Sequence, residues 1–143
     1  MYKEFLPCIY LSTRRAANAL TAYYDRAMSE LDITTNQFSI MIHIRTAKEI
    51  KIVDLAKKLK LEKSTLTRTL APLIEQEYIH SRRGENRKEI ILKLTDKGQE
   101  KMSQAFPVWC ELQKEVIDFL GGKKEAEEFV EKLLRIQMIK EIE

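Results

Sequence analysis

The sequence has few of the residues from which catalytic and metal sites are usually built. Its 143 residues include only two cysteines, Cys8 and Cys110, and two histidines, His43 and His80. These four residues are isolated from one another, so they form neither a zinc-ligand pattern nor a disulfide framework. No nucleophile with a neighbouring base and no carboxylate pair can be assembled from the spacings either. We therefore expect a protein that is not an enzyme and that holds no metal and no cofactor.

Long apolar segments are absent as well. No stretch approaches the roughly 18 consecutive apolar residues of a membrane-spanning helix, and no basic segment precedes an apolar one near residue 1. These absences predict no membrane span and no secretory signal, and hence a cytoplasmic protein. Repeats, low-complexity tracts and flexible linkers are also missing, and the length suits one domain with its own core.

Positive charge is concentrated in the middle of the chain. The formal net charge is only +3, but residues 45–97 hold 14 lysines and arginines against 8 acids. The rest of the chain holds 11 lysines and arginines against 14 acids. A local positive field favours DNA binding, because each phosphate that is neutralised releases condensed counterions.

Residues 52–75 predict two short helices joined by a tight turn, which is the spacing of a helix-turn-helix. The apolar stripe of the first helix consists of Val53, Leu55, Ala56 and Leu59. Leu61 closes the turn, and Ser64 is the expected N-cap of the second helix. The stripe of the second helix, which should face the core, consists of Leu66, Leu70, Leu73 and Ile74.

The opposite face of the second helix is polar and cationic in its first half. Its residues are Lys63, Ser64, Thr65, Thr67 and Arg68. Hydroxyls and guanidinium groups contact phosphates and base edges in protein–DNA complexes. Glu75 would be repelled by phosphate, so only the first two turns should enter the major groove. Pro72 removes a backbone donor and predicts a bend between the two halves.

A β-hairpin is predicted after the second helix. The apolar residues of its strands are Ile79, Ile90, Leu92 and Leu94. Its tip, residues 83–88, is basic, and Gly84 and Asn86 are expected to supply the positive φ of a turn. The tip residues expected to contact DNA are Arg83, Asn86, Arg87 and Lys88. Two such helices and a basic hairpin form a winged helix-turn-helix, which places a helix in the major groove and the wing against the backbone or minor groove.

Helices are predicted on both sides of this module, so the fold class is mostly α with a small β-hairpin wing. The first expected helix covers about residues 6–31, and the second begins at Thr34 or Thr35. After the wing, one helix runs from a Thr95 cap to a stop at Gly121 and Gly122, and a last helix covers about residues 124–142. The terminal helices are too apolar to stay exposed. We therefore expect a homodimer in which these N- and C-terminal helices form the interface.

The module resembles the MarR family of transcriptional regulators. The resemblance rests on S-x-L-T-R-x-L at residues 64–70, on the basic wing, and on LKLTDKG at residues 92–98. TAYYDRAM at residues 21–28 and ITTNQFSIMIHI at residues 33–44 are similar to the first two helices of the family. The resemblance therefore covers nearly the whole chain.

The resemblance implies a single MarR-like domain over residues 1–143. Within it, the winged helix-turn-helix takes about residues 34–97, and the dimerisation region takes about residues 1–33 and 98–143. The family's wing pattern D-x-R falls on Glu85, Asn86 and Arg87, so Arg87 is the expected minor-groove arginine, with Glu in place of Asp. The dimer would present two winged helix-turn-helix modules, here called heads, to a pseudo-palindromic double-stranded operator. Its half-sites would lie about one turn, roughly 10 base pairs, apart.

Two classes of function remain open. The first is a DNA-binding regulator, usually a repressor in this family, that a small-molecule effector releases by changing the spacing of the heads. In the peroxide-sensing branch of the family a cysteine is oxidised instead, and Cys8 with Tyr24, nearby in the same chain or in the partner, resembles that arrangement. The second class is a winged-helix module that binds proteins and not DNA. Basic surface on both the first half of the helix, which carries no acid, and the wing favours the first class.

Overall fold

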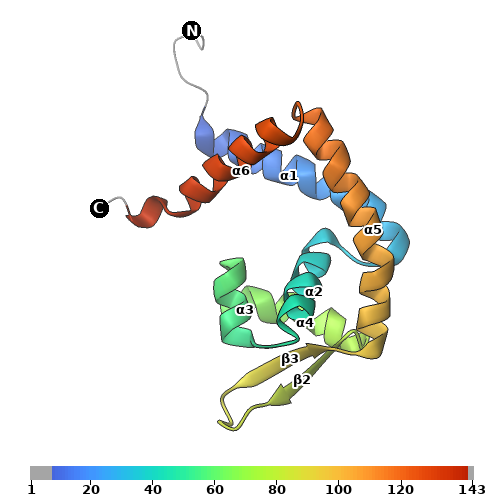
Figure 1. The fold of residues 1–143 in the computed structure, drawn as a ribbon. Helices are drawn as coiled ribbons and strands as arrows, with labels where there is room; N and C mark the ends of the chain where they lie inside the picture. The colour runs from blue at the N-terminus through green and yellow to red at the C-terminus, as the bar shows by residue number, and fades with distance from the viewer. Residues whose placement is uncertain (1–7, 142–143) are drawn as a thin grey trace. The chain divides into compact units, whose positions relative to one another are not determined.

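The computed structural model describes residues 8–141. Its helices are α1 (Ile9–Met28), α2 (Thr35–Ala47), α3 (Ile52–Leu59), α4 (Lys63–Glu75), α5 (Asp96–Phe119) and α6 (Lys123–Gln137), with short 3-10 turns η2 (Ser29–Leu31) and η3 (Ile139–Glu141). Its strands are β1 (Glu49–Lys51), β2 (Ile79–Arg83) and β3 (Ile90–Leu94) (Figure 1). The predicted fold class, mostly helical with a small β-wing, is confirmed. None of the described helices is long and apolar enough to cross a membrane.

The chain divides into two compact units, Met1–Phe106 and Pro107–Glu143. The first unit contains α1 to α4, the sheet and the beginning of α5, so it includes the whole predicted DNA-binding module. The second unit contains the rest of α5, with α6 and η3. The boundary lies at Pro107, inside α5, which continues past this proline.

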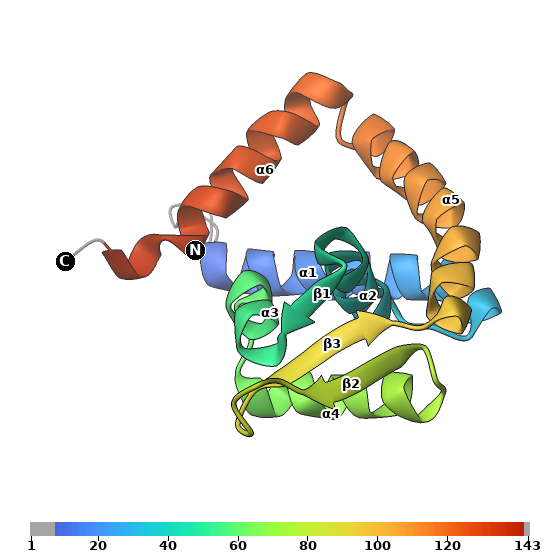
Figure 2. The ribbon, with the colours of Figure 1, turned by 60° about the horizontal axis from the view of Figure 1, so that its bottom comes forward.

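The wing belongs to a three-stranded antiparallel sheet with the order β1-β3-β2. Ile50 of β1 pairs with Leu92 of β3, and Ile79 of β2 pairs with Leu94. Figure 2 shows the three strands side by side, and in Figure 1 the β2–β3 hairpin extends past α3 and α4. The sequence analysis predicted only the hairpin, because a strand of three residues is too short to show an alternating pattern.

The core of the first unit joins the helix-turn-helix to the sheet. Its fully buried large side chains are Met28, Ile40, Met41, Ile44, Leu55, Leu66, Leu70, Leu73, Ile79, Leu92 and Met102. Burial of each such side chain is worth about 1.5–3 kcal/mol. The inner face of α4, the helix predicted to enter the major groove, is therefore packed firmly in the core, and this packing sets the orientation of its outer face.

Two residues of the predicted apolar stripes are exposed, and Leu59 is half-buried. Val53 is 45% exposed and Ile74 is 38% exposed. In α3 the buried position is the neighbouring Ile52, which is 5% exposed, because the helix begins there and turns Val53 by about 100° toward the outside. In α4, Ile74 lies next to fully buried Leu73 and faces outward by the same rotation.

The predicted N-cap of the second helix is wrong by two positions. Helix α4 begins at Lys63, so Glu62 is its N-cap and Ser64 lies inside the first turn. The Glu62 side chain makes no capping hydrogen bond. The cause is the way α3 ends: Lys60 adopts the left-handed region with φ 52°, and the Leu61 N–H donates to the Ala56 carbonyl. This tight C-terminal turn returns the chain to helical geometry early.

Three other predicted helix boundaries agree with the structure, whereas the last helix is shorter than the predicted 124–142, because α6 ends at Gln137 and the 3-10 turn η3 follows. Thr34 caps α2 through a capping box with Gln37, in which two reciprocal hydrogen bonds measure 3.1 and 2.9 Å. The Thr95 hydroxyl accepts a hydrogen bond from the Gly98 N–H at 3.0 Å, at the start of α5. Gly121 and Gly122 follow the end of α5 with φ values of 106° and 113°. The predicted helix ends at residues 6 and 142 lie outside the described residues.

Candidate nucleic-acid interface

The first half of α4 presents polar side chains on a rigidly mounted helix. Lys63, Ser64, Thr67 and Arg68 are exposed, and Thr65 is half-buried. Behind them, Leu66 and Leu70 are buried in the core. Because successive residues turn by about 100°, burial of these leucines fixes Arg68 on the opposite, outward face. The structure thus brings together the five predicted residues of the recognition helix.

Electrostatics at the beginning of α4 favour an anion, with one exception. The first N–H groups of a helix have no intrahelical acceptor, and they lie at the positive end of its dipole. No acidic side chain occurs in the first turn. The exception is exposed Glu62, the residue just before the helix, whose carboxylate would repel a phosphate.

Two threonine hydroxyls in α4 already donate to the backbone. The Thr67 hydroxyl donates to the Lys63 carbonyl at 2.8 Å, and the Thr69 hydroxyl donates to the Thr65 carbonyl at 3.0 Å. A hydroxyl in this state can still accept a hydrogen bond, for example from a base amino group, but cannot donate to a phosphate without breaking its helical bond. Thr67 is therefore better suited to a base edge than to the DNA backbone.

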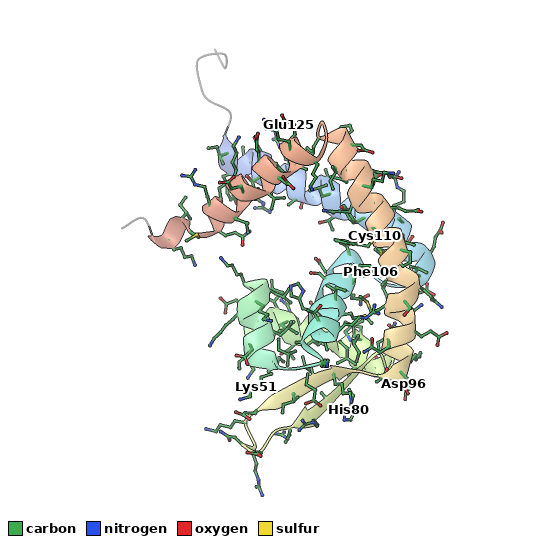
Figure 3. The ribbon with its side chains drawn as sticks, in the orientation of Figure 1. Lys51, His80, Asp96, Phe106, Cys110 and Glu125 are labelled. Atoms are coloured by element: carbon green, nitrogen blue, oxygen red, sulfur yellow. The ribbon has the colours of Figure 1, made fainter. Side chains whose placement is uncertain are left out.

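The tip of the wing is closed by hydrogen bonds within the hairpin. The Gly84 N–H donates to the Glu89 carbonyl at 2.9 Å, and the Glu89 N–H donates to the Asn86 carbonyl at 2.8 Å. The Asn86 side-chain oxygen also accepts from the Lys88 N–H at 3.3 Å. Arg87 and Lys88 are exposed, and side chains extend outward from the tip in Figure 3. The tip can therefore offer two cations to DNA.

The predicted positive φ at Gly84 and Asn86 is wrong. Among the described residues, positive φ occurs at four non-glycine positions and at Gly121 and Gly122, but at neither tip residue. Gly84 has a different role, because a Cβ atom there would lie 2.8 Å from Glu89 Oε2 and 3.0 Å from Glu89 Cβ. The glycine therefore allows the two strands to approach closely at the tip.

Arg83 differs from the other predicted tip contacts in having an internal partner. Its Nη1 donates to the backbone carbonyl of Arg87 at 2.6 Å. Within residues 8–141, the Arg87 side chain itself has no hydrogen bond or ion pair. The structure thus gives the two tip arginines different surroundings.

Strand β1 supports the wing through two ion pairs that the sequence analysis missed. Lys51 Nζ lies 3.0 Å from Glu89 Oε1, and Arg82 Nη2 lies 3.2 Å from Glu49 Oε2. The hydrogen bond and charge of Glu89 raise the pKa of Lys51 above its ordinary value. Lys51 lies beside the strands in Figure 3. No local pattern predicts these pairs, because their members are 38 and 33 residues apart in the chain.

The turn between α4 and β2 is held by two lysines of α5. Lys97 Nζ and Lys101 Nζ lie 5.1 and 5.6 Å from the centre of the Tyr78 ring. Lys97 also donates to the Gln76 carbonyl at 2.8 Å, and Lys101 donates to the Leu31 carbonyl at 2.9 Å. These two cations therefore fix the base of the module.

The candidate redox pair Cys8 and Tyr24 does not meet within one chain. Cys8 is the exposed N-cap of α1, whereas Tyr24 is buried near the other end of the same helix. They are 16 positions apart, which corresponds to about 24 Å at 1.5 Å per residue. Burial raises the pKa of the Tyr24 hydroxyl above its ordinary value. A contact between Tyr24 and Cys8 would therefore require the Cys8 of a second subunit.

A cavity of about 210 Å³ lies beside the recognition helix. Its lining residues are Asn36, Ser39, Ile40, Leu59, Leu61, Thr65 and Thr69. Amide and hydroxyl groups alternate there with aliphatic side chains, and no charged residue lines the cavity. Separately, no group of three potential metal ligands occurs among residues 8–141.

Comparison with known proteins agrees with this geometry. The MarR family profile matches residues 33–90. The multiple antibiotic resistance protein MarR of Salmonella typhimurium is 32% identical over 102 residues, which cover 68% of each chain. Among solved structures, the M. tuberculosis regulator MosR in complex with DNA has a TM-score of 0.82 and 28% identity, covering 92% of this chain and 97% of that one.

A mutant MarR of E. coli complexed with operator DNA has the same fold, with a TM-score of 0.81 and 24% identity, covering 96% of this chain and 98% of that one. The resemblance seen in the motifs of residues 64–70 and 92–98 is thereby confirmed. The winged-helix architecture, the matched family profile and the identity to MarR agree with one another. This chain is a member of the MarR family of DNA-binding transcriptional regulators.

Proposed function

We propose that the protein binds a pseudo-palindromic DNA operator as a homodimer and represses transcription there. The observation that carries the proposal is the exposed polar face of α4, which is mounted on buried leucines next to a closed and cationic wing tip. In each half-site, the first two turns of α4 enter the major groove, and the wing tip contacts the adjacent minor groove and backbone.

Each residue of the interface has a chemical role in this proposal. Arg68 donates to a guanine edge in the major groove, because a guanidinium matches the two acceptors of guanine. Lys63 and Ser64 contact phosphates near the helix N-terminus, and Thr65 and Thr67 contact bases. Arg87 enters the minor groove, where narrow A·T-rich segments attract arginine. At the tip, Asn86 and Lys88 bind the backbone.

The proposal of a dimer is supported by apolar side chains at both ends of the chain. On α6, Val130, Leu134 and Met138 follow one another at helical spacing, and all three are exposed. On α1, Ile9 and Tyr10 are also exposed. Such apolar surface is typical of a subunit interface. The structural relative MosR was solved in complex with DNA, which supports a DNA-binding role for this chain.

We further propose that a small-molecule effector controls DNA binding in the cytoplasm. The cavity beside α4 supports this proposal, because its lining includes Thr65 of the recognition helix. Its mixture of hydroxyl, amide and aliphatic groups, without charge, suits a small neutral amphipathic compound. Oxidation of Cys8 is the second candidate signal, which the exposure of this thiol supports.

The experiment that tests the proposal is a DNA-binding titration. An operator is first selected from random double-stranded DNA, and binding is then followed by fluorescence anisotropy at fixed salt. Arg68→Ala should cost about 1–3 kcal/mol and relax base preference at one position of each half-site. Lys132→Ala, an equal change of charge at an exposed position of α6, is the control and should bind like the wild type. Failure to select any DNA sequence, or equal affinity of Arg68→Ala and the control, would refute the proposal.

A further inference from the structure

We propose that Arg83 is a positioning residue for Arg87: it holds the wing tip in the shape that presents Arg87 to DNA, and it does not contact DNA itself. This inference rests on the proposed function, in which Arg87 enters the minor groove. It changes the role that the basic pattern of the tip predicted for Arg83, which was a direct DNA contact.

The first observation is the hydrogen bond across the tip. Arg83 is the last residue of β2, and its Nη1 donates to the Arg87 carbonyl at 2.6 Å. A hydrogen bond from a charged guanidinium is shorter and stronger than one between neutral groups. Among the hydrogen bonds of the described residues, this is the one that the Arg87 carbonyl accepts. The bond therefore ties the backbone of Arg87 directly to the end of the strand.

The second observation is that the other bonds of the tip enclose Arg87, as the Asn86 side chain does by accepting from the Lys88 N–H, but use no atom of Arg87 itself. Backbone hydrogen bonds close the tip at Gly84 with Glu89 and at Glu89 with Asn86. The ion pair of Lys51 and Glu89 then fastens the Glu89 side of the tip to β1. These contacts hold the base of the turn, but none of them involves Arg87. The hydrogen bond from the Arg83 guanidinium to the Arg87 carbonyl, here called the brace, fixes the backbone of Arg87.

Charge explains why an arginine suits this position. Two cations close together at the tip repel each other, but the Arg83 guanidinium faces the partial negative charge of a carbonyl. The bond uses one of the five N–H donors of the Arg83 guanidinium, and it orders the Arg87 backbone before DNA is bound. Ordering a side chain before binding lowers the entropic cost of association.

Arg82 provides a matched control in the same strand. It is adjacent in sequence, has the same side chain, and pairs with Glu49 at 3.2 Å on β1. Because successive strand residues point to opposite faces, Arg82 lies on the other face from Arg83. Replacement of either arginine by alanine removes the same charge from the wing, but only replacement of Arg83 removes the brace on Arg87.

The test is a double-mutant cycle of Arg83→Ala and Arg87→Ala, measured by operator binding at fixed salt. We expect each single variant to weaken binding at least about fivefold, which exceeds the scatter of additive effects. In the Arg87→Ala background, Arg83→Ala should weaken binding no further and leave the salt dependence unchanged. Arg82→Ala should change affinity less than about twofold, as expected of an exposed ion pair. Arg83→Lys keeps a cationic hydrogen-bond donor and should recover part of the lost affinity.

Losses that multiply in the double variant would overturn the inference, because Arg83 would then contact DNA independently. If Arg83 contacts a phosphate, Arg83→Ala should also reduce the slope of log K against log salt concentration by about 0.9. Failure of the proposed function gives a different result, because the wild type would then bind no DNA. The positioning role of Arg83 would then be refuted as well. Equal binding of Arg87→Ala and wild type would also overturn the role.

A second readout requires no DNA. Amide hydrogen exchange, followed by NMR, should be faster at Gly84 and Glu89 in Arg83→Ala than in wild type or in Arg82→Ala, because loss of the brace loosens the turn. Unchanged exchange at both amides would overturn the inference, whatever the DNA titrations give.

Discussion

Gly98 is the residue whose replacement should damage this fold most for the smallest change in chemistry. It lies in the first turn of α5 and is buried against the turn that joins α4 to β2. A Cβ atom added to Gly98 would lie 2.1 Å from the Tyr78 carbonyl oxygen and 3.0 Å from its carbonyl carbon. Both neighbours are backbone atoms, so no side-chain rotation can relieve the clash.

The cost of Gly98→Ala can be worked from these contacts. Overpacking of a tight site costs about 1–3 kcal/mol, and a clash with backbone belongs at the upper end. Displacement of Tyr78 would also weaken the hydrogen bond that its carbonyl accepts from the Thr95 N–H at 3.1 Å, worth about 1 kcal/mol. Alanine is the better helix former by about 1 kcal/mol. The net loss should therefore be about 3 kcal/mol.

Chemical denaturation followed by circular dichroism, at fixed protein concentration, measures this loss. Gly84→Ala is the control, because its Cβ would meet mainly the Glu89 side chain, whose carboxylate can move away. That variant should lose at most about 1 kcal/mol, as surface substitutions do. A Gly98→Ala protein as stable as the wild type, or more stable than Gly84→Ala, would refute the steric argument.

Three further predictions concern the recognition helix, the dimer and the effector. Glu62→Ser should stabilise the protein by about 0.5–1 kcal/mol, because serine is a better N-cap, and should tighten operator binding by removing an acid. Weaker operator binding in a DNA titration would contradict this account of α4. Removal of residues 123–143 deletes α6 and should abolish the dimer in sedimentation experiments; a full-length protein that sediments as a monomer at micromolar concentration would contradict the two-headed arrangement. If oxidation is the signal, organic peroxide should release wild type and Cys110→Ser from DNA but not Cys8→Ser, and a wild type that stays bound would leave small molecules as the effector.

The local pattern of the sequence determined the helices, some of their caps and the hairpin. Leu66, Leu70 and Leu73 recur at helical spacing, and all three are buried. The next helix was predicted to begin at Thr34 or Thr35, and Thr34 is its N-cap, in a capping box with Gln37. These features depend on residues within one or two turns of each other, so they can be recognised before any tertiary contact is known.

Only the tertiary structure decided how the DNA-binding surface is supported. The three residues of β1 become a strand because β3, about 40 residues later, offers them a free edge. Glu62 replaced Ser64 as the N-cap because of the geometry at the end of α3.

The tip arginines show the same limit of local pattern. Arg83 and Arg87 are equivalent in a list of cations, but in the folded hairpin one is bonded to the backbone of the other. A pattern along the chain reports which side chains can share a face, whereas the partner that each side chain finds depends on the packing of segments distant in sequence, which periodicity does not encode.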